Sequence, residues 1–218
     1  MRVIHLVHST LVVLMLFSAT ATAQDPSSYT ELPKFQQVTD RLYRGGQPRE
    51  GGLRRLRELG IDTIVNLRGT SKTTKAEEVE ARAIGFNYFN VALPNWGRPQ
   101  DERVRRALLI IGAPQNGRVF VHCRDGVDRT GMIVALHRIT HQDWKTADAL
   151  AEAEHLGMRR YQFWMRDYAE EYGERAHLFP YESDLDDRIG RSMRLVERGA
   201  FRAGKVSGKV LRKAPNVF

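Results

Sequence analysis

Two residues that stand six positions apart, Cys123 and Arg129, could together perform nucleophilic chemistry on an anion. Cys123 follows a short apolar, β-branched run over 118–122, which predicts a buried strand. From Thr130 onward the sequence is apolar on nearly all sides, which predicts a buried helix. The residues between them therefore form a loop that leads from a strand into the first turn of a helix.

A loop of this kind is suited to binding an oxyanion. Its successive backbone N–H groups point into one concavity at the positive end of the helix dipole, so a phosphate fits there without any side chain. We expect the amides of six residues to form this cradle: Arg124, Asp125, Gly126, Val127, Asp128 and Arg129.

The side chains around the loop have distinct predicted roles. The field of the helix favours the thiolate of Cys123, the form that attacks phosphorus and yields a cysteinyl-phosphate for water to hydrolyse. The planar guanidinium of Arg129 can bind two phosphoryl oxygens at once, which a lysine does less well. We expect the Thr130 hydroxyl to hydrogen-bond the thiolate, and His122 to help orient the loop.

This pattern resembles the signature of the cysteine-dependent protein tyrosine and dual-specificity phosphatase superfamily. The resemblance rests on six positions: His122, Cys123, Gly126, Arg129, Thr130 and Gly131. The segments 41–48 and 64–69 also resemble small bacterial dual-specificity-type phosphatases, so the likeness covers residues 38–172. It implies a phosphomonoester hydrolase that uses no metal and no organic cofactor. Arg44 and Arg68, at predicted strand ends, either face the phosphate or pack as framework.

The proton donor for the leaving group has two candidates. Members of the superfamily carry an aspartate on a separate mobile loop, which here is 94–101, and its one acid, Asp101, fits the start of a helix equally well. Asp128 is the rival, because the pattern Cys-x-Asp-Gly-x-Asp-Arg-Thr is similar to the loop of the myotubularin lipid phosphatases, where an in-loop aspartate has been proposed as the acid. A carboxyl beside a bound phosphate is protonated more readily, since like charges repel. We prefer Asp128 and keep Asp101 as the alternative.

The predicted fold is α/β. Strands over 61–67, 86–93 and 118–122 alternate with helices over 53–59, 76–84, 101–111, 143–156 and 158–172. This alternation predicts a central, mostly parallel sheet flanked by helices, as the dual-specificity phosphatase resemblance also implies. The catalytic loop then lies at the carboxyl end of a strand, where such sheets bind ligands.

The chain divides into four predicted segments. Residues 1–23 have the pattern of a signal peptide, with Arg2, an apolar core and a small-residue cleavage site before Gln24, and they predict export to the periplasm or the medium. A linker over 24–37 precedes a phosphatase domain over 38–175, and a basic tail covers 176–218. Residues 188–218 contain nine Lys or Arg and one acid, an excess that equals the net charge of +8 of the whole chain.

Partners follow from this charge distribution. The tail fits an anionic membrane surface, a polyanionic substrate or an acidic partner, or it is simply solvated. Export and the lack of a recognisable module exclude nucleic acid. His137 and His141 lack a third ligand, so no metal site is expected. As the sole cysteine, Cys123 cannot form an intramolecular disulfide.

Three functions remain open at this point. The favoured hypothesis is a protein tyrosine or dual-specificity-type phosphatase that acts on a phosphorylated protein. The second is a phosphoinositide or inositol phosphate phosphatase, suggested by the Asp-Gly-x-Asp loop and the basic tail. The third is a phosphate-binding pseudophosphatase or adaptor, but such a protein would have lost Cys123 or Arg129, and both are present.

Overall fold

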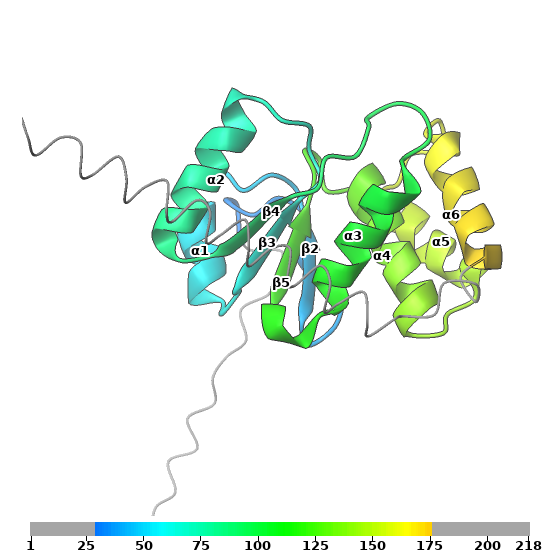
Figure 1. The fold of residues 1–218 in the computed structure, drawn as a ribbon, viewed down its shortest axis with the longest axis horizontal. Coiled ribbons are helices and arrows are strands. Elements are labelled where there is room, and N and C mark those ends of the chain that lie inside the picture. Colours follow the sequence, from blue (N-terminus) through cyan, green and yellow to red (C-terminus); the bar gives the residue numbers. More distant parts are fainter. Residues whose placement is uncertain (1–28, 176–218) are drawn as a thin grey trace, which may run out of the picture.

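The computed structural model describes residues 29–175 (Figure 1). At its centre lies a five-stranded sheet in the order β1-β2-β5-β3-β4. The strands are β1 (Gln36–Gln37), β2 (Leu42–Gly45), β3 (Thr63–Asn66), β4 (Asn87–Asn90) and β5 (Val119–His122). β1 pairs antiparallel with β2, and the other neighbours pair in parallel. The predicted α/β fold with a mostly parallel sheet is therefore confirmed.

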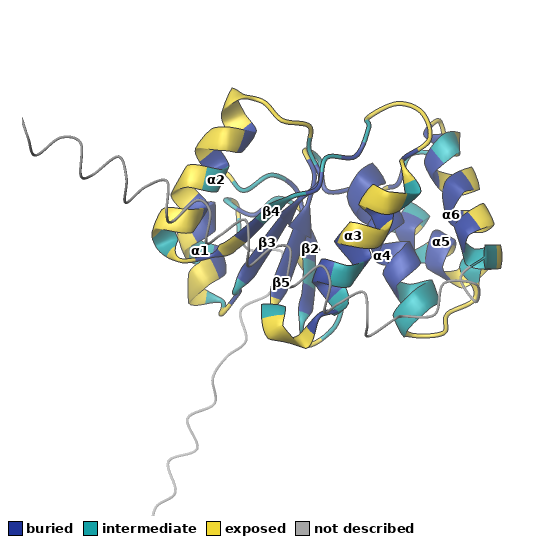
Figure 2. Cartoon of the chain, in the orientation of Figure 1, coloured by how far each residue is buried: buried dark blue, intermediate teal, exposed yellow. Residues whose placement is uncertain are grey.

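Helices cover both faces of this sheet. They are α1 (Gly52–Glu58), α2 (Lys72–Ile84), α3 (Asp101–Gly112), α4 (Asp128–His141), α5 (Thr146–His155) and α6 (Phe163–Arg175). Figure 1 shows α1 and α2 on one face and α3 to α6 on the other. Successive strand residues point to opposite faces, so Ile64 and Phe120 pack with α1 and α2, while Val65 and Val121 pack with the second group. The strands and the inner faces of the helices are buried (Figure 2).

The position of β5 determines where the predicted site lies. β5 runs between β2 and β3, and His122 at its end is in register with Gly45 and Asn66 at the ends of those strands. Because parallel strands end at the same edge of a sheet, the three chain segments that follow β2, β3 and β5 meet there. The loop after His122 therefore has neighbours on both sides.

Several element boundaries differ from the sequence prediction. α2 begins at Lys72 rather than 76, because Ser71 caps it in a capping box with Thr74. α4 begins at Asp128, two residues before Thr130. The predicted helix over 143–156 is α5, which begins at Thr146 with Lys145 as its N-cap residue. α6 begins at Phe163 rather than 158.

The segment before β2 contributes to the core. Leu32 is 1% exposed, and Phe35 packs its ring against Phe120 of β5 with 5.9 Å between ring centroids. The predicted linker over 24–37 therefore does not extend into the described residues 29–37, because these apolar side chains fill the space under α1. The predicted signal peptide over 1–23 and basic tail over 176–218 lie outside the described residues. Among residues 29–175, no helix is long and apolar enough to cross a bilayer.

Candidate active site

Cys123 and Arg129 lie at the two ends of the loop between β5 and α4, as the sequence predicts. Cys123 follows β5 directly and is 2% exposed. Arg129 lies in the first turn of α4, and its Nη1 donates to the carbonyl oxygen of Leu67, beyond the end of β3, at 3.5 Å. The structure thus brings the predicted nucleophile and the predicted phosphate ligand into one loop.

The backbone of this loop presents free hydrogen-bond donors. Within residues 29–175, none of the backbone N–H groups of residues 124–130 donates to another part of the chain. Val127 occupies the N-cap position of α4, and no side chain caps the helix there. Unpaired amides at the positive end of a helix are the donors that an oxyanion requires. The loop can therefore bind an anion of the size of phosphate.

β2 and the residues after it hold the outer side of the loop. Gly126 has φ of 75°, and a β-carbon on it would lie 2.5 Å from the carbonyl carbon of Gly45, so only glycine fits. Arg44, which is 2% exposed, donates from Nη2 to the Gly126 carbonyl oxygen at 2.9 Å. The Gln47 amide donates to the Arg124 carbonyl oxygen at 3.0 Å. Arg44 was expected either to face the phosphate or to pack as part of the framework. The structure favours packing, because the guanidinium supports the loop from behind.

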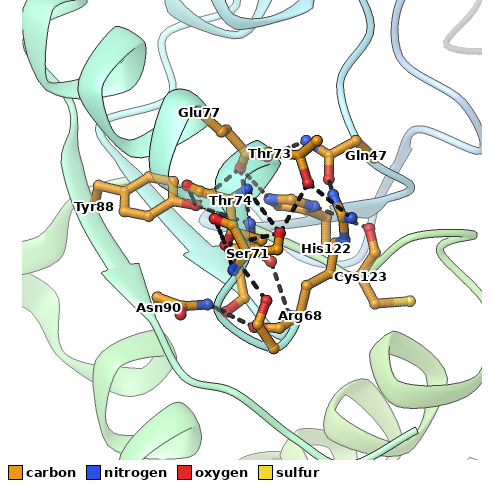
Figure 3. Close-up of polar contacts among 12 residues, drawn as sticks. Gln47, Arg68, Ser71, Thr73, Thr74, Glu77, Tyr88, Asn90, His122 and Cys123 are labelled. Carbon is orange, nitrogen blue, oxygen red and sulfur yellow. Dashed lines mark hydrogen bonds and ion pairs between the residues drawn. The ribbon is translucent and has the colours of Figure 1, made fainter.

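On the other side, His122 connects the nucleophile to a buried acid that the sequence did not single out (Figure 3). The Nδ1 atom of His122 lies 3.0 Å from the Cys123 carbonyl oxygen, and Nε2 lies 2.8 Å from Oε1 of Glu77. Glu77 comes from α2 and is 7% exposed. The only sequence feature that could have indicated Glu77 is that an acidic residue stands on the inner face of a helix.

Arg68 belongs to the same network. It donates from Nη1 to the side-chain oxygen of Gln47, whose nitrogen donates in turn to Oε2 of Glu77. Its Nη2 lies 3.3 Å from Thr73 Oγ1 at the start of α2 (Figure 3). Arg68 is therefore tied to α2, and no contact of its guanidinium with the catalytic loop is seen among residues 29–175.

Asp128 is held by Arg159, which precedes α6. Its Oδ1 accepts from the Arg159 amide at 2.9 Å, and its Oδ2 accepts from Nε at 2.8 Å and from Nη2. Arg159 also donates to Asp125 at 3.2 Å. Arg124 hydrogen-bonds Asp125 at 2.9 and 3.1 Å and holds the pKa of that carboxyl below its ordinary value. Because both Asp128 oxygens already accept hydrogen bonds from Arg159, Oδ1 from its backbone amide and Oδ2 from its guanidinium, the geometry opposes our preference for Asp128 as the proton donor.

The side chain of Asp101 is more exposed to solvent than that of Asp128. Asp101 is the first residue of α3, and the N-cap position belongs to Gln100. Its Oδ1 accepts from the Tyr168 hydroxyl at 3.1 Å, its Oδ2 pairs with the Arg175 guanidinium at 3.6 Å, and its side chain is 38% exposed. The loop before it carries Trp96, which is 65% exposed and touches Trp164 of α6 with 5.0 Å between ring centroids. This loop therefore lies on the surface against α6.

Two further predictions concern Thr130 and the histidine pair. The hydroxyl of Thr130 is fully buried but has no hydrogen-bond partner among the described residues, so the expected bond to the Cys123 thiol is not formed. His137 and His141 stack at 4.6 Å, and burial lowers the pKa of His137 to about 4. Among residues 29–175 no group of three potential metal ligands occurs.

Comparison with known families agrees with this geometry. The family model described as PTP-NADK, a DSP-PTPase phosphatase fused to NAD+ kinase, matches residues 18–167, which is more than half of the chain. The chain belongs to this family. The match includes all five strands and the loop from Cys123 to Arg129. Membership of the cysteine-dependent dual-specificity and tyrosine phosphatase superfamily, predicted from the signature, is confirmed.

The chain is similar in sequence to a bacterial phosphatase, and its fold is similar to that of a yeast phosphatase. The dual specificity protein phosphatase TpbA of Pseudomonas aeruginosa is 28% identical over 141 residues, which are 64% of this chain and 59% of TpbA. The chain thus spans less than two thirds of that curated relative. The crystal structure of P. aeruginosa TpbA has a TM-score of 0.59 at 23% identity, over 72% of this chain and 92% of that one. The catalytic domain of the PP-IP phosphatase SIW14 from S. cerevisiae has a TM-score of 0.56 at 19% identity, over 73% and 93%. The fold is therefore that of the dual-specificity phosphatases.

Proposed function

We propose that this chain is a cysteine-dependent phosphatase that hydrolyses phosphate monoesters through a cysteinyl-phosphate intermediate. The observation that carries this proposal is the loop itself, in which the backbone amides of residues 124–129 follow Cys123 and donate to no other described part of the chain. An anion that these amides and the guanidinium hold has its phosphorus next to the only thiol of the chain.

The chemistry then takes two steps. The Cys123 thiolate attacks phosphorus, so that a P–S bond forms as the bond to the leaving oxygen breaks. The amides of the loop and Arg129 stabilise the charge that spreads over the other phosphoryl oxygens. Water next attacks the phosphocysteine, inorganic phosphate leaves, and the thiolate is regenerated.

The leaving oxygen needs a proton, and we assign its donation to Asp101. Asp101 lies at the end of an exposed loop, and its side chain is partly exposed although its carboxylate pairs with Arg175. Asp128, in contrast, is 5% exposed and saturated by Arg159. In this proposal Asp128 fixes the catalytic loop to the turn before α6.

The favoured substrate is a phosphorylated protein side chain. The relative TpbA carries the name dual specificity protein phosphatase, and one TpbA structure is a complex with phosphotyrosine. A polyphosphorylated inositol or its lipid is the second candidate. It is supported by Arg124 in the loop, whose side chain is 63% exposed, and by the fold shared with a PP-IP phosphatase.

A phosphate-release panel tests the function and separates the candidates. Phosphotyrosine peptides, phosphoserine peptides, phosphoinositides and inositol phosphates are compared with the full chain, the Cys123→Ser variant and the Arg129→Lys variant. We expect phosphotyrosine peptides to be hydrolysed fastest, no turnover with Cys123→Ser, and severe impairment with Arg129→Lys. Retention of activity within about tenfold in Cys123→Ser would contradict the proposal. Faster release from inositol phosphates would select the second candidate.

We also propose that the protein is exported. The pattern of residues 1–23 supports this proposal. An exported phosphatase with a single cysteine has no second thiol in its own chain to protect the nucleophile from oxidation.

A further inference from the structure

A cavity of about 700 Å³ lies behind the catalytic loop, where Arg44 supports Gly126. Its walls come from residues 29–36, from β2 and the segment after it, and from the end of α5. Gly126 lines it, but Cys123 and Arg129 do not, so the cavity is separate from the proposed phosphate site. Its volume is in the range of small-molecule sites, which are concave and partly apolar.

The charged side chains that line this cavity are all basic. Arg44 is buried, Lys34 and Arg49 are exposed, and His155 also lines the cavity. No acid belongs to the lining, and none of the three cations Lys34, Arg44 and Arg49 forms an ion pair within residues 29–175. Three positive charges without a partner around one hollow attract an anion.

Two acids near the cavity are already occupied by other arginines. Glu31, which lies in the first wall segment, pairs with Arg55 at 3.0 Å. The charge of Glu152 acts to raise the pKa of Arg44, but both oxygens of Glu152 accept from Arg138, at 2.7 and 3.1 Å. Neither acid is therefore free to neutralise the cavity.

Arg44 has a hydrogen-bond donor that the described fold does not use. Its Nη2 donates to the Gly126 carbonyl oxygen at 2.9 Å, whereas its Nη1 is buried and has no partner among residues 29–175. Burial outweighs the charge of Glu152 and holds the pKa of the guanidinium below its ordinary value. Buried donors in proteins are nearly always paired with protein, water or a bound ion. An oxyanion in the cavity would give this guanidinium both an acceptor and an opposite charge.

The remaining wall is largely apolar and includes two aromatic rings. Tyr29 and Phe35 meet edge to face with 5.8 Å between their ring centroids, and Leu32 and Leu156 line the same hollow. These side chains offer contact area to a flat or apolar group. Cations combined with an apolar wall match an organic phosphate better than a bare inorganic ion, which would leave this wall uncovered.

We propose that the cavity is a second anion site that binds a small organic phosphate: the three cations hold the phosphate, and the rings of Tyr29 and Phe35 contact its apolar part. This inference goes beyond the proposed function, because it involves neither Cys123 nor hydrolysis. The bond from Arg44 to Gly126 connects the site with the back of the catalytic loop.

The test follows the binding of 1-naphthyl phosphate by amide NMR of the nitrogen-15-labelled full chain with Cys123→Ser, which should not hydrolyse the probe. The amides of Gln36 and Gly157 report on the cavity, and those of Asp128 and Arg129 report on the catalytic loop. We expect two separate binding curves, one for each pair of amides.

A double substitution, Lys34→Ala with Arg49→Ala, separates the two sites. Both side chains are exposed, so the variant should fold. We expect the dissociation constant at the cavity to rise by about tenfold or more, because two charged hydrogen-bond donors are lost. The dissociation constant at the catalytic loop should stay unchanged. Arg106→Ala with Lys145→Ala is the matched control, because it removes the same charge from exposed positions outside the cavity.

The absence of shifts at Gln36 and Gly157 would overturn the inference. Shifts there that follow the curve of the catalytic loop and survive the double substitution would also overturn it. Equal binding of 1-naphthol, which lacks the phosphate, would refute an anion site. Binding at the cavity without binding at the loop would remove support for the proposed function and leave the inference standing.

Discussion

Asp101 and Asp128 differ in what already surrounds their carboxylates. Arg159 supplies all the hydrogen bonds to Asp128, whereas Asp101 accepts one from the Tyr168 hydroxyl, lies 3.6 Å from the Arg175 guanidinium and stays partly exposed. A general acid must hold a proton before the bond to the leaving group breaks. The side chain of Asp101 is exposed enough for a leaving group to approach, whereas Asp128 is 5% exposed and both its oxygens are occupied by Arg159.

The two variants Asp101→Asn and Asp128→Asn should therefore respond differently to the leaving group. Asp101→Asn should lower kcat on alkyl phosphates by about 10²–10⁴-fold and have much less effect on para-nitrophenyl phosphate, whose leaving oxygen scarcely needs a proton. Asp128→Asn should cause similar losses on both substrates, because it loosens the contact with Arg159. Steady-state kinetics of both variants on both substrates identifies the acid. A loss confined to alkyl phosphates in Asp128→Asn, with similar losses on both substrates in Asp101→Asn, would return the role of acid to Asp128.

The residues that the sequence revealed are those that lie close together in it. Cys123, Arg129 and the amides between them form one short stretch whose chemistry follows from spacing. Glu77 and Arg159 are as closely connected to the loop in space, but 45 residues separate Glu77 from His122 and 31 separate Arg159 from Asp128. Only the fold brings these pairs together, so no local pattern could indicate them.

At the level of elements, the catalytic loop depends on its contact with β2. Gly126 lies against Gly45 and Gly46, and Arg44 holds its carbonyl oxygen. The amides of the loop can point inward because this outer side is fixed. The same strand thus supports the loop without contributing a group to the proposed chemistry.

Gly126→Ala should test this support. The added β-carbon would lie 2.5 Å from backbone atoms of Gly45 and Gly46, and its φ of 75° is unfavourable for alanine. We expect a loss of about 1–3 kcal/mol of stability and a fall in activity of more than about tenfold. Gly69→Ala is the control, since nothing lies within 4 Å of a β-carbon there. Thermal unfolding and para-nitrophenyl phosphate hydrolysis report the two effects, and a fully active, equally stable Gly126→Ala variant would show that the contact is dispensable.

The elements themselves were largely predictable, and their boundaries were less so. Apolar or alternating runs predicted β3, β4 and β5, whereas β1, which consists of two exposed glutamines, fell in the predicted linker. Glycines such as Gly60 and Gly85 correctly ended α1 and α2. The start of α2 was missed because its capping box uses Thr74 in place of the usual Glu or Gln. Leu32 and Phe35 stand in a polar stretch with prolines, and their burial depends on α1 and β5, which lie far along the chain.

For the whole molecule, the largest excess of positive charge lies after residue 187, and the proposed export signal lies at the other end of the chain. Residues 188–218 carry a net charge of +8, and residues 29–175, with 24 Lys or Arg and 20 Asp or Glu, carry +4, an excess that the four acids of residues 176–187 offset. Attraction of an anionic surface or substrate by the tail would therefore add to the recognition of phosphate by the loop.

The proposed export predicts that the mature chain begins near Gln24. A signal peptidase that recognises the small residues before Gln24 would leave that residue at the new amino terminus. Sequencing the amino terminus of protein purified from the native host, with its cellular fraction recorded, measures this. An intact Met1 in the cytoplasmic fraction would be incompatible with export.

The central claim is that Cys123 carries the phosphoryl group between substrate and water. The direct measurement mixes the full chain with phosphate-labelled substrate, quenches with acid during turnover and locates the label by mass spectrometry. The account predicts labelled phosphate on Cys123 and none on the Cys123→Ser variant. Turnover by the unmodified chain with no label on Cys123, or with label on another residue, would contradict it.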